Sequence, residues 1–528
     1  MHMTNKNCKC QFVKRISGGL FVVLLVGSFI LFLQSCNEKK EEERPNILVI
    51  LTDDQEFNEI SKFGGKVLTP NMDRIGTEGV VLDRFYASSP VCTPSRYSML
   101  TGRYASRNQN IVRLYPPNEP AFIRWNADIL AGQEKTIAHI LGDAGYSTGM
   151  VGKWHLGQPT PELTYQETWN EDLNDPFVAQ QVKIFYEGMR EYVKYAGGFQ
   201  YVESLYGNNL HALGLPVKDQ LHNMEWVTSG ALNFLDQYNP QKTGKPFFLF
   251  FSPTPPHIPD GVESMLSDGR VTAAGLLEHP IEGVQPSRAD VFRRVKEAGL
   301  DSSTAPITWL DDGIGSVLKK IEDLKQLENT LVIFMSDNGS HRGKMTCYED
   351  AAHMPAMIMW KGKITPGRSL HDLMSNIDIV PSILDICGIS KPNDYMVDGI
   401  SLKNTLLTGQ PLDRSFLYLE VVYQRGIVTK DWKYLATRFP KYTEALITPE
   451  NRKHYSLEGR PLRDRYQAET FFPAYFDDDQ LYNLTNDPKE QKNLSGEVKY
   501  KGKMEEMRSY MKKVVSTLPN AFGEFMGK

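Results

Sequence analysis

The chain has 528 residues, of which 41% are hydrophobic and 23% are charged. These proportions are ordinary for a globular protein, so they exclude a disordered chain, a coiled coil and a collagen-like fibre. A net charge of −5 and a sequence pI near 6.2 provide no basic field for nucleic acid, and a mean hydropathy of −0.38 excludes a polytopic membrane protein. The length predicts two or more domains, or one large α/β domain with an appendage.

The N-terminal segment has the pattern of a bacterial lipoprotein signal. Residues 1–15 carry Lys and Arg but no acidic residue, and residues 16–33 are almost wholly apolar. The Leu-Gln-Ser-Cys sequence at 33–36 resembles a lipobox, in which Cys36 would receive lipid and become the new N-terminus, although Gln34 departs from the usual small or aliphatic residue. An uncleaved anchor or a plain signal peptide stays open, because about 18 apolar residues also just span a bilayer.

A polar stretch with a run of lysines and glutamates follows at 36–44, which is typical of a solvated tether. It resembles the acidic tether of surface-exported Bacteroidetes lipoproteins. We therefore predict a lipoprotein signal peptide at 1–35 and a tether at 36–44. Lipid on Cys36 would attach an exported protein to the inner or outer membrane, in the periplasm or at the outer-membrane surface.

Three cysteines remain beyond the tether, at positions 92, 347 and 387. An odd number in an exported protein leaves at least one thiol that needs an explanation. A disulfide between Cys347 and Cys387 stays open. No spacing in the chain is typical of a zinc site.

Strands and helices alternate from residue 45 onward. Four continuous apolar runs have the composition of strands buried on both faces. They lie at 46–51, 146–151, 247–251 and 331–335. Helical periodicity separates them, at 136–144, 226–238 and 310–327. The alternation predicts an α/β fold for residues 45–405, with a large, mostly parallel sheet sandwiched by helices.

The composition changes after about residue 405. Short antiparallel strands are expected at 416–422, 426–429 and 432–437, and one long amphipathic helix at 498–518. We predict a smaller C-terminal α+β domain over 406–528.

Each of the four apolar runs is followed by charged, titratable or amide side chains. They are Asp53 and Asp54, then Lys153 and His155, then His257, then Asp337 and Asn338. Ligands of open α/β sheets bind at the carboxyl ends of the strands, so these side chains are expected to form one site. Clustered carboxylates repel one another, and oxygen ligands suit Ca²⁺ or Mg²⁺. The alternative is that the acidic pairs only cap loops, since Asp and Asn favour turns.

Cys92 begins the sequence Cys-Thr-Pro-Ser-Arg. With Thr93 as N-cap and Pro94 at the first helical position, Cys92 lies at a helix N-terminus, where an anion is stabilised. Cys92 is interpreted either as a small buried hydrophobe or as a catalytic thiolate. Neither interpretation explains a soft sulfur beside a site for a hard cation.

These segments resemble the formylglycine-dependent sulfatases, a family with the alkaline-phosphatase-like fold, and in particular Bacteroidetes carbohydrate sulfatases. The matching segments occur in the family's order, at 46–54, 92–96, 100–103, 152–157, 255–257, 337–339, 344, 348–349 and 480–494. In that family a maturation enzyme oxidises the cysteine to formylglycine, whose hydrate supplies the nucleophilic oxygen and a metal ligand. The resemblance covers residues 45–494.

The resemblance implies a role for each matched residue. Asp53, Asp54, Asp337, Asn338 and the modified Cys92 would hold the cation, which is usually Ca²⁺, with Mg²⁺ as the alternative. Arg96 would stabilise the hydrated aldehyde. Lys153 and Lys344 would neutralise the sulfate oxygens. His257 would protonate the leaving oxygen, and His155 would take the remaining hydroxyl proton.

The implied activity is hydrolysis of a sulfate ester on a carbohydrate. The alternatives are a phosphonate or phosphodiester hydrolase of the same superfamily, and a catalytically silent glycan-binding lipoprotein. Substrate contacts are expected in the insertions 104–134, 160–220 and 438–479. His353, Arg103, Arg107, Trp154, Tyr348 and Glu349 are interpreted as structural. For His341 and Arg342, a place in the sulfate pocket stays open.

Overall fold

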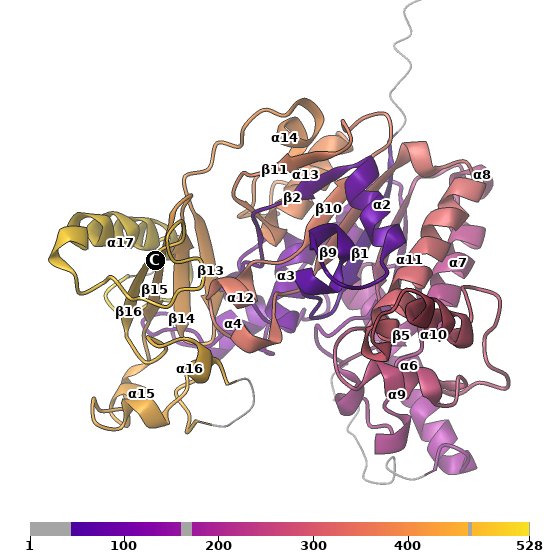
Figure 1. Cartoon of the computed structure of the whole chain (residues 1–528), viewed down its shortest axis with the longest axis horizontal. Coiled ribbons are helices and arrows are strands. Elements are labelled where there is room, and N and C mark those ends of the chain that lie inside the picture. The colour runs from indigo at the N-terminus through magenta and orange to yellow at the C-terminus, as the bar shows by residue number, and fades with distance from the viewer. Residues whose placement is uncertain (1–43, 160–171, 463–466, 527–528) are drawn as a thin grey trace, which may run out of the picture. The chain divides into compact units, whose positions relative to one another are not determined.

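The computed structural model describes residues 44–159, 172–462 and 467–526. The described residues from Pro45 onward form one compact unit (Figure 1). The predicted signal peptide and nearly all of the tether lie outside the described residues and stay predictions. Among the residues that are described, no helix has the length and apolarity that crossing a membrane requires.

An eight-stranded sheet forms the centre of this unit, in the order β11-β2-β10-β9-β1-β6-β4-β5. The strands are β1 (Asn46–Thr52), β2 (Val80–Leu82), β4 (Ser147–Lys153), β5 (Tyr201–Tyr206), β6 (Phe247–Ser252), β9 (Thr330–Ser336), β10 (Ala356–Met359) and β11 (Arg368–Leu370). β10 runs antiparallel to β9 and β2, and the other neighbouring pairs are parallel. The predicted large, mostly parallel sheet is confirmed.

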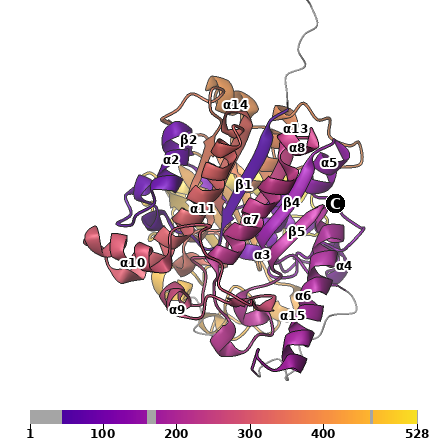
Figure 2. The ribbon, with the colours of Figure 1, turned by 90° about the vertical axis from the view of Figure 1, so that its right-hand side faces the viewer.

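Helices cover both faces of the sheet. Helix α11 (Ala305–Asp323) contacts both α2 (Pro70–Glu78) and α7 (Met224–Tyr238), and α7 and α11 lie in front of the strands in Figure 2. Helices α3 (Cys92–Thr101), α5 (Ile137–Asp143) and α13 (Ile379–Ile386) form a second contacting group. The predicted helix at 310–327 begins five residues earlier, because Pro306 is accepted in the first turn of α11.

The remaining elements lie mostly in the connections. They are β3 (Phe85–Tyr86), β7 (Val271–Thr272), β8 (Gly275–Leu276), β12 (Met374–Ser375), α4 (Gln109–Leu114), α6 (Pro176–Gly197), α8 (Pro240–Thr243), α9 (Gly261–Leu266), α10 (Arg288–Glu297), α12 (Glu349–Ala352), α14 (Lys403–Thr408), α15 (Lys441–Glu444) and α16 (Ala468–Phe471). The helix α6 is well delimited by its sequence. Asp175 caps its first turn, Pro176 begins it and Gly198 ends it in the left-handed conformation.

A second, antiparallel sheet follows in the C-terminal part. Its strands are β13 (Leu417–Val421), β14 (Gln424–Val428), β15 (Trp432–Thr437) and β16 (Asp479–Asn483). Helix α17 (Lys501–Val515) packs on β14 and β15 through Met507 and Met511 (Figure 1). The predicted α+β character is confirmed, although α17 is shorter than the expected helix at 498–518. The domain boundary at 405/406 stays a prediction.

The register of the central strands places the site. Thr52 of β1 lies opposite Ser336 of β9, so the residues that follow these strands, Asp53 and Asp337, emerge side by side. Gly152 of β4 lies opposite Ser252 of β6, which brings Lys153 to the same edge. Parallel strands end at one edge, and here that edge carries all four groups of predicted site residues.

Candidate active site

The thiol of Cys92 lies at the centre of the predicted site residues. Its Sγ is 3.6 Å from Asp53 Oδ1, and 3.8 Å from both Asp54 Oδ1 and Asn338 Oδ1. Lys344 Nζ lies 3.4 Å from the same sulfur. The structure therefore brings residues that are almost 300 positions apart in the sequence to one atom.

Helix α3 begins at Cys92 itself, with Val91 as the N-cap. The expected N-cap at Thr93 is wrong, because the helix begins before that residue. Pro94 then falls in the first turn, where its missing N–H costs no helical hydrogen bond. The expectation that Cys92 lies at a helix N-terminus holds. The positive end of the helix dipole thus points at this side chain, which favours negative charge there.

Arg96 is one turn along α3 and is completely enclosed. Its Nη2 lies 2.8 Å from Asp337 Oδ2 and its Nη1 donates to Ser252 Oγ at 2.7 Å. A third contact, from Nη1 to the carbonyl oxygen of Lys153 at 3.0 Å, joins α3 to the end of β4. Arg96 therefore fixes three strand ends relative to the helix that carries Cys92.

Two lysines reach the carboxylates from opposite parts of the chain. Lys153 Nζ lies 2.5 Å from Asp53 Oδ2, and Lys344 Nζ lies 2.5 Å from Asp54 Oδ1. Both lysines are buried. An anionic substrate would compete with these carboxylates for the lysines, unless a cation holds the carboxylates instead.

The oxygen atoms fit a hard divalent cation. Asp53, Asp54, Cys92 and Asp337 each offer one ligand atom within 4.8 Å of the others. Burial and the Asp53 carboxylate raise the pKa of Asp337 to about 6, which shows how closely the carboxyl groups are packed. A cation at this point would relieve that repulsion, and carboxylate and amide oxygens are the ligands that Ca²⁺ and Mg²⁺ prefer.

His257 faces the carboxylates from the loop after β6. Its Nε2 lies 3.7 Å from Asp54 Oδ2, and its Nδ1 is 2.8 Å from the carbonyl oxygen of Ile258. A carbonyl only accepts, so Nδ1 carries a hydrogen and Nε2 faces the site. Burial, together with Lys153, lowers the pKa of His257 to about 3, and the negative charge of a bound anion acts in the opposite direction.

His155 approaches from β4, with a positive backbone φ of 58°. Its ring is buried, and its Nδ1 has no hydrogen-bond partner among the residues that the structure describes. Burial, and then the charge of Lys153, lowers its pKa well below the ordinary value. A buried neutral imidazole with an open nitrogen is suited to accept a proton.

One buried histidine, His222, was not predicted from the sequence, and it lies behind His257. Its Nε2 is 2.7 Å from the carbonyl oxygen of His257, and its Nδ1 is 2.7 Å from Thr254 Oγ1. His222 belongs to no recognisable sequence pattern, and only the folded loop brings it beside His257.

The other residues singled out in the sequence agree mostly with structural roles. His353 lies between the rings of Phe57 and Tyr86, and its Nε2 is 2.7 Å from the carbonyl oxygen of Asp83. Arg103 and Arg107 pair with Glu134 and Asp398, Trp154 is buried, Tyr348 stacks on Phe472, and Glu349 pairs with Lys433. Arg342 lies over the ring of Phe471, whereas His341 Nδ1 lies 4.0 Å from Asp54 Oδ2 at the rim of the site.

Cys347 and Cys387 lie in separate environments, and the disulfide that the sequence left open is absent from the described residues. Cys347 lies against Gln424, and Cys387 accepts a hydrogen bond from Tyr146 at 3.1 Å. Both are buried and pack as small apolar side chains.

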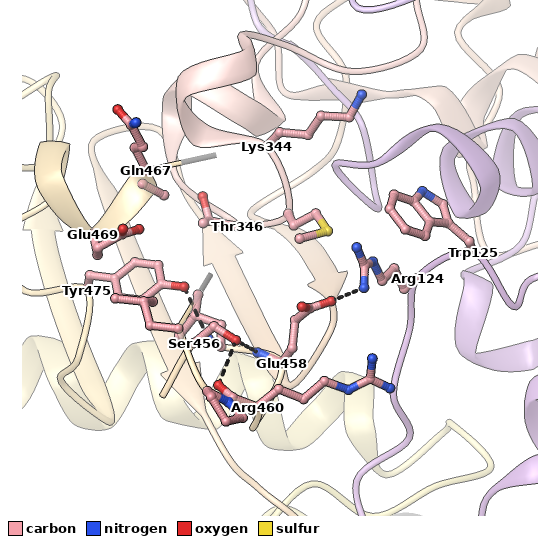
Figure 3. A pocket seen from close by; sticks show the side chains of 15 residues that line it. Arg124, Trp125, Lys344, Thr346, Ser456, Glu458, Arg460, Gln467, Glu469 and Tyr475 are labelled. Atoms are coloured by element: carbon pink, nitrogen blue, oxygen red, sulfur yellow. Dashed lines mark hydrogen bonds and ion pairs between the residues drawn. The ribbon is translucent and has the colours of Figure 1, made fainter. Parts of the chain in front are cut away.

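Two cavities border the site. One is lined by Lys344 together with residues of the segments 124–125 and 456–475 (Figure 3). The other is lined by His155 together with residues of 125–128, 157–158, 185–189 and 207–212. All three insertions that were expected to contact substrate thus contribute described residues to these cavities.

Comparisons with known proteins give one consistent result. A family model described as "Sulfatase" matches residues 45–389, and one described as "N-sulphoglucosamine sulphohydrolase, C-terminal" matches residues 339–445. Among curated proteins, the N-acetylgalactosamine-6-sulfatase of Homo sapiens is 29% identical over 398 residues, which cover 71% of this chain and 68% of that protein. The N-acetylglucosamine-6-O-sulfatase of Bacteroides thetaiotaomicron is 24% identical over 564 residues, covering 92% of this chain and 89% of that protein.

Solved structures show the same fold. One was solved in complex with its substrate D-glucosamine-2-N,6-O-disulfate, and superposes with a TM-score of 0.58 at 21% identity, covering 89% of this chain and 97% of that chain. At this identity, the likeness concerns the fold.

Proposed function

From the premise that the chain belongs to the sulfatase family and is a sulfuric ester hydrolase, we propose that its substrate is a sulfate ester on a carbohydrate. We propose further that Cys92 is converted to formylglycine, and that Asp53, Asp54, Asp337 and Asn338 hold a divalent cation, Ca²⁺ in preference to Mg²⁺. One observation carries this proposal: the oxygens of these four side chains and the ammonium group of Lys344 surround the side chain of Cys92 at the first residue of α3.

The carbohydrate part of the proposal has two supports. The relatives named above act on sulfated amino sugars, according to their names. The two cavities beside the site are lined by polar and charged side chains as well as by Trp125, a composition that suits a hydroxylated ring.

Each residue of the site would have a separate role in the reaction. The hydrated formylglycine would supply the nucleophilic oxygen, and the cation would polarise the sulfate. Lys153 and Lys344, which contact the carboxylates of Asp53 and Asp54, would neutralise the sulfate oxygens as negative charge builds up in the transition state. Arg96 would hold the modified side chain through its contacts with Asp337 and the end of β4.

Two histidines would move the protons. His257 directs Nε2 into the site, because Nδ1 is held by the Ile258 carbonyl, so a proton on Nε2 can pass to the leaving sugar oxygen. After the sulfate has been transferred to one hydroxyl of the hydrate, His155, with its unpartnered Nδ1, would accept the proton of the other hydroxyl. The C–O bond to the sulfate then breaks, so that sulfate leaves and the aldehyde is regenerated. General acid help of this kind is worth about 10²–10⁴-fold for a poor leaving group such as a sugar alkoxide.

The maturation and location of the protein complete the proposal. A formylglycine-generating enzyme would modify Cys92 during synthesis. Export followed by lipid attachment at Cys36 would place the catalytic part (45–405) and the C-terminal part (406–528) in the periplasm or at the outer-membrane surface.

The experiment that tests this proposal combines mass and turnover. Conversion of the Cys92 thiol to an aldehyde lowers the mass of its tryptic peptide by about 18 Da, before hydration. The purified enzyme is then given a sulfated amino sugar, an aryl sulfate and a phosphodiester under the same conditions. We expect the mass shift and faster turnover of the sulfate esters. An unmodified peptide in fully active enzyme would contradict the proposal, and so would a preference for the phosphodiester.

A further inference from the structure

The two cavities beside the site differ in chemistry but share a wall. The Lys344 cavity and the His155 cavity each have a volume of about 340 Å³, within the range of small-molecule sites. Trp125 lines both of them. The catalytic centre thus has a space on the side of Lys344 and another on the side of His155.

Trp125 is held in place by its neighbour. The guanidinium of Arg124 lies 3.6 Å from the centre of the Trp125 ring and forms an ion pair with Glu458 (Figure 3). This arrangement connects the insertion at 104–134 to the insertion at 438–479. Because Arg124 and Glu458 are largely enclosed, the pair fixes the position of the indole between the cavities.

One residue that lines the His155 cavity has a hydrogen-bond acceptor without a donor. Asn209 is only 7% exposed, and its Oδ1 is buried without a hydrogen-bond partner among the residues that the structure describes. A buried acceptor without a partner costs free energy, so its presence indicates a ligand that donates a hydrogen bond. Gln158 and Asn208 line the same cavity and add amide groups.

The Lys344 cavity is lined by side chains of both charges and by hydroxyl groups. Arg460 and Glu469 lie on different sides of it, and Thr346 and Ser456 add hydroxyl groups to its lining (Figure 3). A sugar ring has hydroxyl groups around its edge, and each of them can donate or accept a hydrogen bond. Such a ring can therefore form hydrogen bonds with several of these side chains at once.

On the basis of the sulfatase function above, we propose that the substrate is a sulfated oligosaccharide of at least two sugar units. One unit occupies each cavity, Trp125 lies between them, and Asn209 accepts a hydrogen bond from a sugar hydroxyl. The catalytic centre lies where the two cavities approach each other, so the sulfated unit fills only one of them. A monosaccharide leaves the other cavity, and its contacts, unused.

The test compares substrates of different size. The probes are the 6-O-sulfated monosaccharides of N-acetylgalactosamine and N-acetylglucosamine, disaccharides that contain them, and an aryl sulfate. We expect kcat/KM for the preferred disaccharide to exceed that for its monosaccharide at least tenfold. Replacing Asn209 by Leu removes the acceptor at similar volume. Asn209→Leu should lower the ratio of disaccharide to aryl sulfate kcat/KM on the order of tenfold, the value of one good hydrogen bond.

Two further variants separate binding from folding. Asn209→Asp retains an acceptor oxygen and should recover part of the ratio. Asn233→Leu, on the exposed side of α7, is the matched control and should leave all activities unchanged. Two results would overturn the inference while leaving the sulfatase function intact, provided that the aryl sulfate is hydrolysed. One is a kcat/KM for the disaccharides that only equals that for their monosaccharides, and the other is no turnover of the disaccharides. Failure to hydrolyse any sulfate ester would instead overturn the proposed function.

Discussion

His222 Nε2 lies 2.7 Å from the backbone carbonyl oxygen of His257 and 3.1 Å from that of Pro259. Both oxygens only accept, so Nε2 carries the hydrogen, and Nδ1 accepts from the hydroxyl of Thr254. Burial lowers the pKa of His222 to about 4, so the ring is neutral at physiological pH. A neutral, completely hydrogen-bonded imidazole thus holds both ends of the loop that carries His257.

This relationship predicts a selective defect. His222→Phe keeps a ring of similar shape but removes the hydrogen-bond donor. The backbone carbonyl of His257 then loses its partner, and the His257 side chain shifts away from its position facing the site. We expect kcat on a sulfated sugar to fall on the order of 10²-fold, since small displacements of a catalytic group have effects of that size. The loss on an aryl sulfate should be much smaller. Equal losses on both substrates, in step with a lower Tm, would show that His222 matters only for folding.

The general acid itself is tested through the leaving group. A sugar alkoxide needs a proton when it leaves, whereas a nitrophenolate hardly does. His257→Ala should therefore reduce kcat/KM for the sulfated sugar by about 10²–10⁴-fold and that for nitrophenyl sulfate far less. If His257 only bound the sulfate group, both substrates would suffer to the same extent.

Loss of Cys92 should abolish activity without unfolding the protein. Cys92→Ala removes both the proposed nucleophile and one proposed cation ligand, while α3 keeps its first residue, because Ala is a good helix former. Turnover of every sulfate ester should fall to background, with a Tm close to that of the parent. Cys347→Ala, at a buried thiol outside the site, is the control and should keep its activity. Near-normal turnover by Cys92→Ala would exclude the formylglycine mechanism.

Removal of the cation should be visible in stability as well as in rate. A ligand that binds only the folded protein raises Tm, so chelation should lower Tm and added Ca²⁺ should restore it. Zn²⁺ should restore it less well, because the ligands are mainly oxygen atoms. Asp337→Ala should resemble the chelated enzyme and respond little to Ca²⁺. Elemental analysis detects a tightly held ion, and full activity with no ion present would contradict the site.

The sequence predicted the fold and the meeting of the strand-end side chains better than it predicted the surroundings of that cluster. The strand ends at Asp53, Asp337 and Lys153 could be predicted, because buried apolar runs identify parallel strands, and parallel strands end together. The beginning of α3 could not, since Thr93 is a good cap by type and only the fold shows that Val91 takes that position. His222 contacts a loop that is distant in the sequence, and Trp125 lines both cavities beside segments that are distant in the sequence. Neither arrangement leaves a local pattern in the sequence.

Stability should depend on pH through a buried carboxyl group far from the cluster. Glu490 is completely buried, and lies 3.2 Å from Lys433 Nζ, which also pairs with Glu349 at 2.7 Å. Burial, opposed by Lys433 and reinforced by Glu349, raises the pKa of Glu490 to about 8. In the unfolded chain the pKa of a glutamate is about 4.3. Between these two values the folded state binds a proton that the unfolded state lacks, so the free energy of unfolding falls as pH rises from about 4.3 to about 8.

Glu490→Gln imitates the protonated carboxyl group and does not titrate. Its free energy of unfolding, measured with denaturant at several pH values from 5 to 8.5, should therefore fall less steeply than that of the parent. The variant should gain stability relative to the parent as the pH rises. Glu505→Gln, on the exposed side of α17, is the control and should follow the parent at every pH. A constant difference between Glu490→Gln and the parent across this range would show that Glu490 does not hold the proton, and that Lys433 balances both carboxylates in their charged form.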